Sequence, residues 1–462
     1  MTLDIYTGAY IHQFLLSLYR DRRRKRWNWP RQWKTQPPAS RRGPPSPRAG
    51  SWRWRGSAAP TIAASIDDEA LAAERAHIAR AFPATRTLLS LVGRTHREPI
   101  RSPARSVANL EFHRQGHEID DTARRIVRRL EDMGIRALNP AMAFPMEMER
   151  FPERGWIVSH KRVAQAAGMG RMGIHRSLIH PKFGSFVLLG TVLIAKDFDE
   201  TSKPLEFNPC LECKLCVAAC PVGAIKPDGY FDFSACLNHN YQQFMGGFSN
   251  FIEDIASSKS VREYRSKVSY AETVQRWQSL SYGPNYNAAY CIAVCPAGED
   301  VIGPYRESKR AHREAILDPL AQKPETIYVS RGSDAADHVA RRFPHKTIRW
   351  VRPAGRATSI RGFLFGITLS FQQGKAADLN AVYHFTFTGA QAAKATVIIR
   401  NRRLQVLDGH QGKADLEVTA DGATWLRFLS KEVSIFRCLV TRAIRLKGSP
   451  RLLLAFGKCF PT

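Results

Sequence analysis

Seven of the nine cysteines are concentrated between Cys210 and Cys295. Four of them form the run Cys210-x2-Cys213-x2-Cys216-x3-Cys220, which Pro221 follows directly. This spacing is typical of cubane iron–sulfur sites, because three thiolates at such intervals can surround one face of a cube. Soft thiolates also suit zinc, but zinc ligands usually come in separated pairs. The run therefore predicts a 4Fe-4S cluster in preference to zinc or a purely structural role.

A second part of the pattern follows downstream. Cys291-x3-Cys295-Pro296 repeats the end of the first run, and Cys236 lies between the two. In two-cluster ferredoxins the fourth cysteine of such a run binds the other cluster. Crossed ligation then assigns Cys210, Cys213, Cys216 and Cys295 to the first cluster, and Cys220, Cys236 and Cys291 to the second.

The second cluster lacks one thiolate, because Ala288 stands where a full repeat would place a cysteine, three residues before Cys291. This cluster therefore takes a non-cysteine ligand, has an open iron, is a three-iron form, or is absent. We expect it to be present with an incomplete cysteine set. Cys438 and Cys459 lie far from the run, and we expect both to be buried free thiols.

The chain is basic, with 69 Lys and Arg against 41 Asp and Glu, a net charge of +28. Residues 1–60 hold 13 basic and 2 acidic side chains, and their composition predicts disorder. Such a positive charge favours binding to nucleic acid, acidic lipid or an acidic redox protein. The alternative is that it reflects only an arginine-rich composition bias. We do not expect nucleic acid. The clustered, odd cysteine count argues against a secreted disulfide framework.

Two further patterns bear on location. The clearest uncharged apolar run, 183–195, is too short to span a membrane, which takes about 20 residues. The apolar residues 11–19 precede the basic run, which is the reverse of the order in an export signal. We therefore expect a cytoplasmic protein with no integral membrane segment, of about three domains on length alone.

Helices and short strands alternate before the cysteine run, which predicts an α/β layer architecture. We expect a helix over 66–82 capped by Ser65, a strand over 87–92, a helix over 120–133 and a buried strand over 183–195. Gly168, Gly170 and Gly173 follow an expected helix over 162–167. A phosphate-binding fingerprint would follow a strand, so we favour close packing here. His160, His175 and His180 form no recognised metal spacing, and we expect ordinary polar or capping roles.

Residues about 105–305 resemble the epoxyqueuosine reductases and the related reductive dehalogenases. The matching features are Ala167-Gly-Met-Gly170, the segment 183–190 and the cysteine pattern up to Pro296. Those families join a cobalamin-binding α/β domain to a two-cluster ferredoxin module. The resemblance therefore implies a reductase with an electron donor protein, and it raises cobalamin as a further cofactor.

Three departures limit what the resemblance says about the substrate. The epoxyqueuosine reductases carry an Asp, their proton donor, shortly before the segment that matches His160, where this chain has Glu153, Arg154 and Gly155. Ile174 replaces the usual Lys after the glycine-rich turn, and Ala288 replaces a cysteine. We therefore name no catalytic residue and do not expect a queuosine enzyme.

The last third predicts a strand–helix–strand unit over 326–351, then a helix over 359–373 with Ile360, Phe363 and Ile367 on one face. The turn 331–333 could hold an anion, but a plain loop is the simpler interpretation. Strands over 382–388, 395–400, 404–407 and 415–419 follow, with helices over 425–429 and 450–456. Residues about 358–462 resemble the sterol carrier protein type domain, through the segments 383–389, 414–421 and 444–448. That resemblance implies an apolar tunnel; a filled apolar core is the alternative.

The expected architecture is α/β and α+β multidomain. Its parts are a basic tail (1–58), an α/β domain that can be cobalamin-binding (59–200), a ferredoxin-type iron–sulfur module (201–310), a linker (311–357) and a sterol-carrier-like domain (358–462). We expect an iron–sulfur oxidoreductase that passes electrons from its clusters to a substrate or corrinoid site in the α/β domain. The alternative is a binding protein for a lipid or another apolar ligand, with structural or redox-sensing clusters. A simple electron carrier is a third interpretation.

Overall fold

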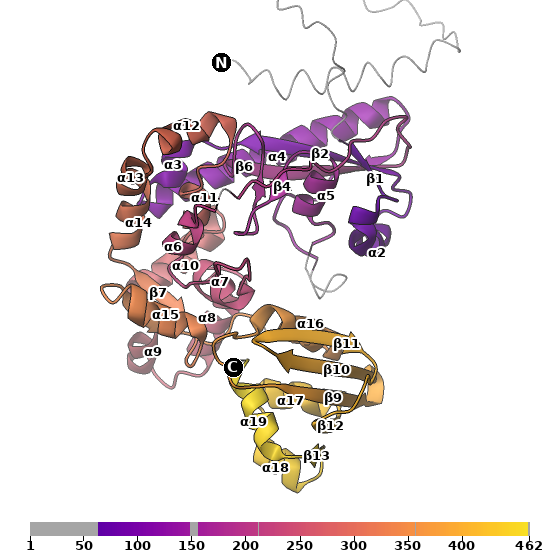
Figure 1. Ribbon diagram of the computed structural model, residues 1–462, viewed down its shortest axis with the longest axis vertical. Helices are drawn as coiled ribbons and strands as arrows, with labels where there is room; N and C mark the ends of the chain where they lie inside the picture. Colours follow the sequence, from indigo (N-terminus) through magenta and orange to yellow (C-terminus); the bar gives the residue numbers. More distant parts are fainter. Residues whose placement is uncertain (1–62, 148–155, 211, 356, 461–462) are drawn as a thin grey trace, which may run out of the picture.

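The structure is a computed structural model that describes residues 63–147, 156–210, 212–355 and 357–460. A sheet-containing unit, a helical region and a second sheet-containing unit follow one another along the long axis (Figure 1). The basic segment 1–58 and the positions of Glu153, Arg154 and Gly155 lie outside the described residues. Within the described ranges, no helix has the length and apolar character needed to cross a bilayer.

The first unit is built on a four-stranded antiparallel sheet in the order β1-β2-β6-β3. The strands are β1 (Ala63–Ser65), β2 (Thr87–Arg94), β6 (Val187–Ile194) and β3 (Ala137–Leu138). A small hairpin, β4 (Arg171–Met172) and β5 (Leu178–Ile179), lies beside it. The helices are η2 (Glu69–Leu71), α2 (Ala72–Ala81), α3 (Arg97–Arg101), α4 (Arg105–Asp132) and α5 (His160–Ala166).

Helices cover both faces of this sheet, which confirms the α/β layers expected from the alternation of elements. Ala123, Ile126 and Leu130 of α4 pack on one face, and α2 and α5 contribute to the core on the other. Helix α4 lies so close to strand β6 that a Cβ at Gly190 would be 2.5 Å from the Ile119 side chain. Two predicted boundaries were wrong. Helix α4 begins at Arg105, and the expected helix over 66–82 begins at Glu69, because Ser65 pairs with Thr87 in the sheet and Asp68 is the cap.

The region after residue 210 is helical. Its helices are α6 (Leu215–Ala219), α7 (Phe233–Asn240), α8 (Gly246–Ala256), α9 (Val261–Lys267), α10 (Tyr270–Tyr282), α11 (Tyr290–Ala293), α12 (Glu299–Glu307), α13 (Lys309–His312), the π-helix η3 (Arg313–Leu317) and α14 (Asp318–Gln322). Helices α6 and α11 are in contact. Each opens one of the two Cys-x3-Cys-Pro repeats, so the packing brings the two repeats together.

The predicted strand–helix–strand unit is present as β7 (Thr326–Val329), α15 (Asp334–Arg342) and β8 (Thr347–Trp350), with the strands parallel. The C-terminal unit has a five-stranded sheet in the order β11-β10-β9-β12-β13. Its strands are β9 (Ala381–Thr388), β10 (Ala393–Arg400), β11 (Arg403–Asp408), β12 (Leu416–Asp421) and β13 (Ile444–Gly448). Its helices are α16 (Ile360–Ser370), η4 (Gly389–Gln391), α17 (Gly422–Leu429), α18 (Ile435–Val440) and α19 (Pro450–Lys458).

An aromatic cluster fills the C-terminal core. Trp425, Tyr383 and Phe385 are almost fully buried, and Phe363 packs edge-on against Trp425. The expected face of α16 is confirmed, since Ile360, Phe363 and Ile367 are buried. The sequence did not predict α18. Cys438 and Cys459 are buried free thiols, as expected.

Candidate iron–sulfur site

The first predicted group of thiols converges around α6. Cys216 on α6 interacts electrostatically with Cys291 and Cys295 of the second repeat, and with Cys213 and Cys210 of the loop before α6. The loop turns tightly, because Glu212 and Lys214 both have left-handed backbone angles. The backbone N–H of Ile174 donates to Cys210 Sγ over 3.3 Å, so the glycine-rich turn of the first unit contacts this group.

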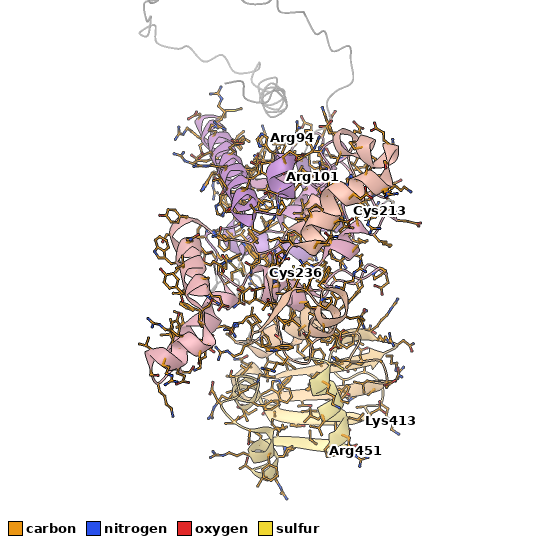
Figure 2. All side chains as sticks on the ribbon, turned by 90° about the vertical axis from the view of Figure 1, so that its left-hand side faces the viewer. Arg94, Arg101, Cys213, Cys236, Lys413 and Arg451 are labelled. Atoms are coloured by element: carbon orange, nitrogen blue, oxygen red, sulfur yellow. The ribbon has the colours of Figure 1, made fainter. Side chains whose placement is uncertain are left out.

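The second predicted group lies deeper in the molecule. Cys236 interacts electrostatically with Cys220 and Cys291, and the N–H of Ala224 donates to Cys220 Sγ over 3.2 Å. The N–H of Ala288 donates to Asn240 Oδ1 over 2.8 Å. Figure 2 labels one thiol of each group, Cys213 nearer the N-terminal unit and Cys236 nearer the centre of the molecule.

The seven thiols are not arranged to hold a single metal ion. Among the described residues, no three His, Cys, Asp or Glu side chains form such a set. A cubane needs a wider arrangement than a mononuclear site, because each thiolate binds a different iron at a corner of the cube. Burial raises the pKa of the Cys291 thiol to about 12 and that of Cys295 to about 11. Thiolates at these positions would therefore need a compensating positive charge.

Arg105 places a largely buried guanidinium group beside the cysteine region. All three of its guanidinium nitrogens are buried, and none has a hydrogen-bond partner in the described part of the chain. Its guanidinium lies over the Tyr290 ring, 5.5 Å from the centroid, and interacts electrostatically with Cys291. Nearby Glu325 is already engaged by Lys346 at 2.8 Å and by the Tyr290 hydroxyl at 2.6 Å. An orphaned buried guanidinium beside a thiol fits an anionic cluster on the cysteines.

Lys161 is a second cation beside the thiols. It interacts electrostatically with Cys291 and Cys236, and its Nζ donates to the carbonyl of Arg176 over 2.7 Å. Burial lowers the pKa of Lys161, whereas negative charge on either thiol raises it. Lys161 lies in α5, so the first unit supplies a positive charge to the second thiol group. Nothing in the sequence marked Arg105 or Lys161 as different from the many other basic residues.

The glycines and histidines of the first unit have packing roles, as expected. Gly168 and Gly170 follow helix α5, and a Cβ at Gly170 would lie 2.4 Å from the Ile179 carbonyl. Burial lowers the pKa of His175 and of His180 to about 4. Each ring accepts a hydrogen bond from the N–H two residues later, that of Ser177 or Lys182, which caps a loop.

The sequence did not indicate a role for one acidic side chain of this unit, Asp120. Asp120 on α4 interacts electrostatically with His160, and its carboxylate accepts the N–H of Met142 over 2.8 Å. Burial raises the pKa of Asp120. His160 Nδ1 lies 2.9 Å from Thr191 Oγ1 of β6, so His160 is held against the sheet. Asp120 and His160 are therefore one pair of proton-carrying groups in this unit.

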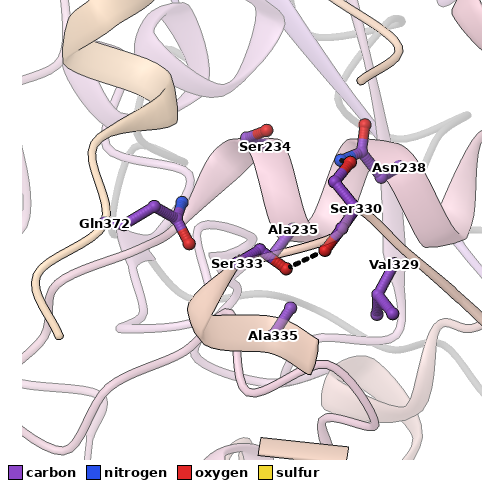
Figure 3. Close-up of a pocket in the computed structure, with 8 residues that line it drawn as sticks. All are labelled: Ser234, Ala235, Asn238, Val329, Ser330, Ser333, Ala335 and Gln372. Atoms are coloured by element: carbon purple, nitrogen blue, oxygen red, sulfur yellow. Dashed lines mark hydrogen bonds between the residues drawn. The ribbon is translucent and has the colours of Figure 1, made fainter. Parts of the chain in front are cut away.

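Two cavities lie where the helical region meets the C-terminal unit. One of about 10 Å³ has room for a single water molecule. Figure 3 shows its lining by α7, α15 and the turn between β7 and α15, with Ser333 Oγ donating to the Ser330 carbonyl. Ser333 also caps α15, so the turn 331–333 is a loop with a structural role. The other cavity, of about 340 Å³, is lined in part by Tyr230, Phe371 and Arg403.

Comparison with known proteins gives two separate likenesses. The sequence description of the SCP-2 sterol transfer family matches residues 370–461. The epoxyqueuosine reductase of Staphylococcus aureus is 25% identical over 178 residues, which is 38% of this chain and 38% of that protein. That of Listeria monocytogenes is 33% identical over 170 residues, 36% of this chain and 35% of that protein. The chain thus spans little more than a third of the length of these curated relatives.

Solved structures give the same two kinds of neighbour. The epoxyqueuosine reductase of Streptococcus thermophilus is 17% identical with a TM-score of 0.27, over 36% of this chain and 43% of that one. An epoxyqueuosine reductase solved with a modified tRNA stem loop is 18% identical with a TM-score of 0.27, over the same shares of the two chains. By sequence, this chain is similar to the epoxyqueuosine reductases over about a third of its length, and it carries an SCP-2 sterol transfer domain at residues 370–461.

Proposed function

We propose that this chain is an iron–sulfur oxidoreductase with two ferredoxin-type clusters. Cys210, Cys213, Cys216 and Cys295 hold the first, and Cys220, Cys236 and Cys291 hold the second. The observation that carries the proposal is the Arg105 guanidinium beside Cys291, which has no hydrogen-bond partner in the described part of the chain. The similarity to epoxyqueuosine reductases supports the same chemistry.

The protein's own residues have defined tasks in this proposal. The clusters, when bound, supply one-electron transfer in a site that the helices shield from water. Arg105 and Lys161 offset the negative charge of the thiolates, and the amides of Ile174 and Ala224 donate to sulfur. Hydrogen bonds and positive charges near sulfur favour the reduced state of such sites.

We place the site of reduction in the first unit, on the side of Lys161. Lys161 keeps solvent-accessible surface, and Cys236 and Cys291 beside it are half-buried. In our proposal a substrate or a corrinoid approaches the second thiol group from this side. Asp120 and His160 are the candidates to carry a proton in this unit, because they interact electrostatically and His160 is hydrogen-bonded to Thr191 of the sheet.

The SCP-2 domain supports an apolar or lipid-like ligand, and with it a second candidate function. In that alternative the chain is a lipid-binding protein whose clusters sense redox state or stabilise the fold. In the reductase proposal, a separate protein is the electron donor. Substrate and partners belong to the proposal, because the likeness to the curated reductases is partial.

Anaerobic purification of the full chain tests the two functions. We expect iron and sulfide for more than one cluster and a spectrum that bleaches on reduction. A co-purifying corrinoid supports the reductase with a corrinoid site, whereas extracted lipid without corrinoid supports the lipid-binding alternative. The same preparation is assayed for retained tRNA, and we expect none. Zinc in place of iron under anaerobic conditions would contradict both functions.

A further inference from the structure

The end of the C-terminal unit exposes apolar side chains on two helices. Phe436 is 76% exposed and Val440 is 67% exposed, and both lie on α18 four residues apart, on one helix face. Cys438 on the same helix is buried, and Ile435 and Leu439 pack against the core. Helix α18 is therefore held by its inner side while Phe436 and Val440 project outward.

Helix α19 repeats this arrangement. Leu453 and Phe456 are buried in the core, whereas Leu454 is 65% exposed. Helices α18 and α19 form the end of the molecule farthest from the first unit (Figure 1), and Figure 2 places Arg451 at the same end. The three apolar side chains and the basic residues around them are called here the α18–α19 tip.

The tip carries a strong excess of positive charge. From Lys431 to Lys458 the chain has seven basic residues and one acidic residue, Glu432. Arg437, Arg442 and Arg451 are exposed, and none of them forms an ion pair within the described part of the chain. Exposed apolar side chains among unpaired arginines are typical of surfaces that bind the headgroup region of anionic bilayers.

We propose that the α18–α19 tip docks on the surface of a bilayer that contains anionic phospholipid. Phe436, Val440 and Leu454 enter the boundary between headgroups and acyl chains, and Arg437, Arg442 and Arg451 bind lipid phosphates. Charge complementarity favours this occupant over a second copy of the chain, because two basic tips repel each other. Three projecting apolar side chains are also too few for the core of a stable protein interface of standard size.

The proposal is independent of the redox function, since it rests on a surface that lies outside the cysteine region. Its test is co-sedimentation of the full chain with vesicles of phosphatidylcholine alone, or of phosphatidylcholine with about 30% phosphatidylglycerol. We expect binding to the anionic vesicles that weakens with added salt, because phosphate contacts are screened. The wild-type chain should bind the neutral vesicles about tenfold more weakly.

Two sets of substitutions separate the contributions of the tip. The combination Phe436→Ser, Val440→Ser and Leu454→Ser should weaken binding to anionic vesicles about tenfold, through lost apolar burial. The combination Arg437→Gln, Arg442→Gln and Arg451→Gln should weaken it similarly and flatten its salt dependence. Unchanged iron content and circular dichroism establish that each variant is folded.

Matched controls remove equal numbers of exposed side chains elsewhere. Arg124→Gln, Arg128→Gln and Arg129→Gln on α4 lower the net charge by the same amount, and Val261→Ser, Trp277→Ser and Leu280→Ser remove exposed apolar groups of the helical region. The basic segment 1–60 is present in every variant, so only differences between variants are compared. The proposal is overturned if folded tip variants bind as the wild type does, if the controls lose as much binding as the tip variants, or if the wild type binds neither vesicle.

Discussion

The guanidinium of Arg105 lies 5.5 Å from the ring centroid of Tyr290, the residue directly before Cys291. Arg105 begins helix α4 of the first unit, and Tyr290 begins α11, which opens the second cysteine repeat. The contact therefore brings a positive charge of one unit to the thiols of the other. No group in the described residues satisfies this guanidinium by hydrogen bonding. An anionic cluster is the partner whose presence would explain its burial.

The first prediction concerns this charge. Arg105→Met should lower the midpoint potential of the nearer cluster by on the order of 60 mV, because loss of a positive charge disfavours the added electron. Arg105→Lys should retain most of the wild-type value. Redox titration followed by electron paramagnetic resonance measures both. Arg124→Met, on the exposed side of the same helix, is the control and should leave the potential unchanged. Equal shifts of the midpoint potential in Arg105→Met and Arg124→Met would show that the position of Arg105 near Cys291 does not affect the potential.

The second prediction concerns the first cluster. Cys213→Ala removes one of its four thiolates, so the chain should lose or degrade that cluster, since an open iron is prone to oxidation. Iron and sulfide analysis of the anaerobic protein is the measurement. Cys438→Ala, which removes a buried thiol of the C-terminal core, should keep the full iron content. A Cys213→Ala protein with the iron, sulfide and spectrum of the wild type would refute the assignment.

The third prediction concerns the unequal ligand sets. The second cluster has three thiolates, so it should lose iron first on mild oxidation and give a three-iron signal in electron paramagnetic resonance. Ala288→Cys should suppress that signal, because a fourth thiolate retains the open iron. Ala289→Cys, one position further along, should not. The assignment fails if the anaerobic protein contains iron for one cluster only, or if Ala288→Cys leaves oxidative iron loss unchanged.

The fourth prediction concerns Glu325, which joins β7 to the cysteine region. Burial alone would raise the pKa of Glu325, but hydrogen bonds from Lys346 and Tyr290 and the charge of Lys323 lower it. Glu325→Gln should reduce the free energy of unfolding by about 3 kcal/mol at pH 7, because Lys346 is then left buried without its anion. Glu417→Gln, at an exposed ion pair with Lys447, is the control and should leave the free energy of unfolding nearly unchanged.

The sign of the pH dependence follows from the lowered pKa. A carboxylate whose pKa is lower in the folded chain than in the unfolded chain stabilises the fold above about pH 4.3, the ordinary value for Glu. That contribution is lost as the pH falls through the folded-state pKa. Thermal unfolding of both proteins from pH 7 down to about pH 3 measures it, because the folded-state pKa lies below the ordinary value. The difference in free energy of unfolding between the wild type and Glu325→Gln should become smaller at low pH. A difference that stays constant with pH would contradict the ionic role of Glu325.

Local pattern was sufficient for much of the architecture. The periodicity of apolar residues predicted β2, α16, β9 and the strand–helix–strand unit that contains β7 and β8, because each buries one face set by its own residues. The periodicity failed where residues distant in the sequence decide where a helix begins or whether it forms. Ser65 looks like a helix cap in the sequence but pairs with Thr87 in the sheet, and α18 is held by tertiary packing around Cys438.

The cysteine spacing predicted which thiols share each cluster, from the two Cys-x3-Cys-Pro repeats and the crossed ligation typical of such runs. Their role as iron ligands stays a prediction that the experiments above address. Only the tertiary structure selected Arg105 and Lys161 from 69 basic residues, and only it joined Asp120 to His160. Burial and charge at a site depend on residues far away in the sequence. The periodicity of a single segment carries no information about such contacts.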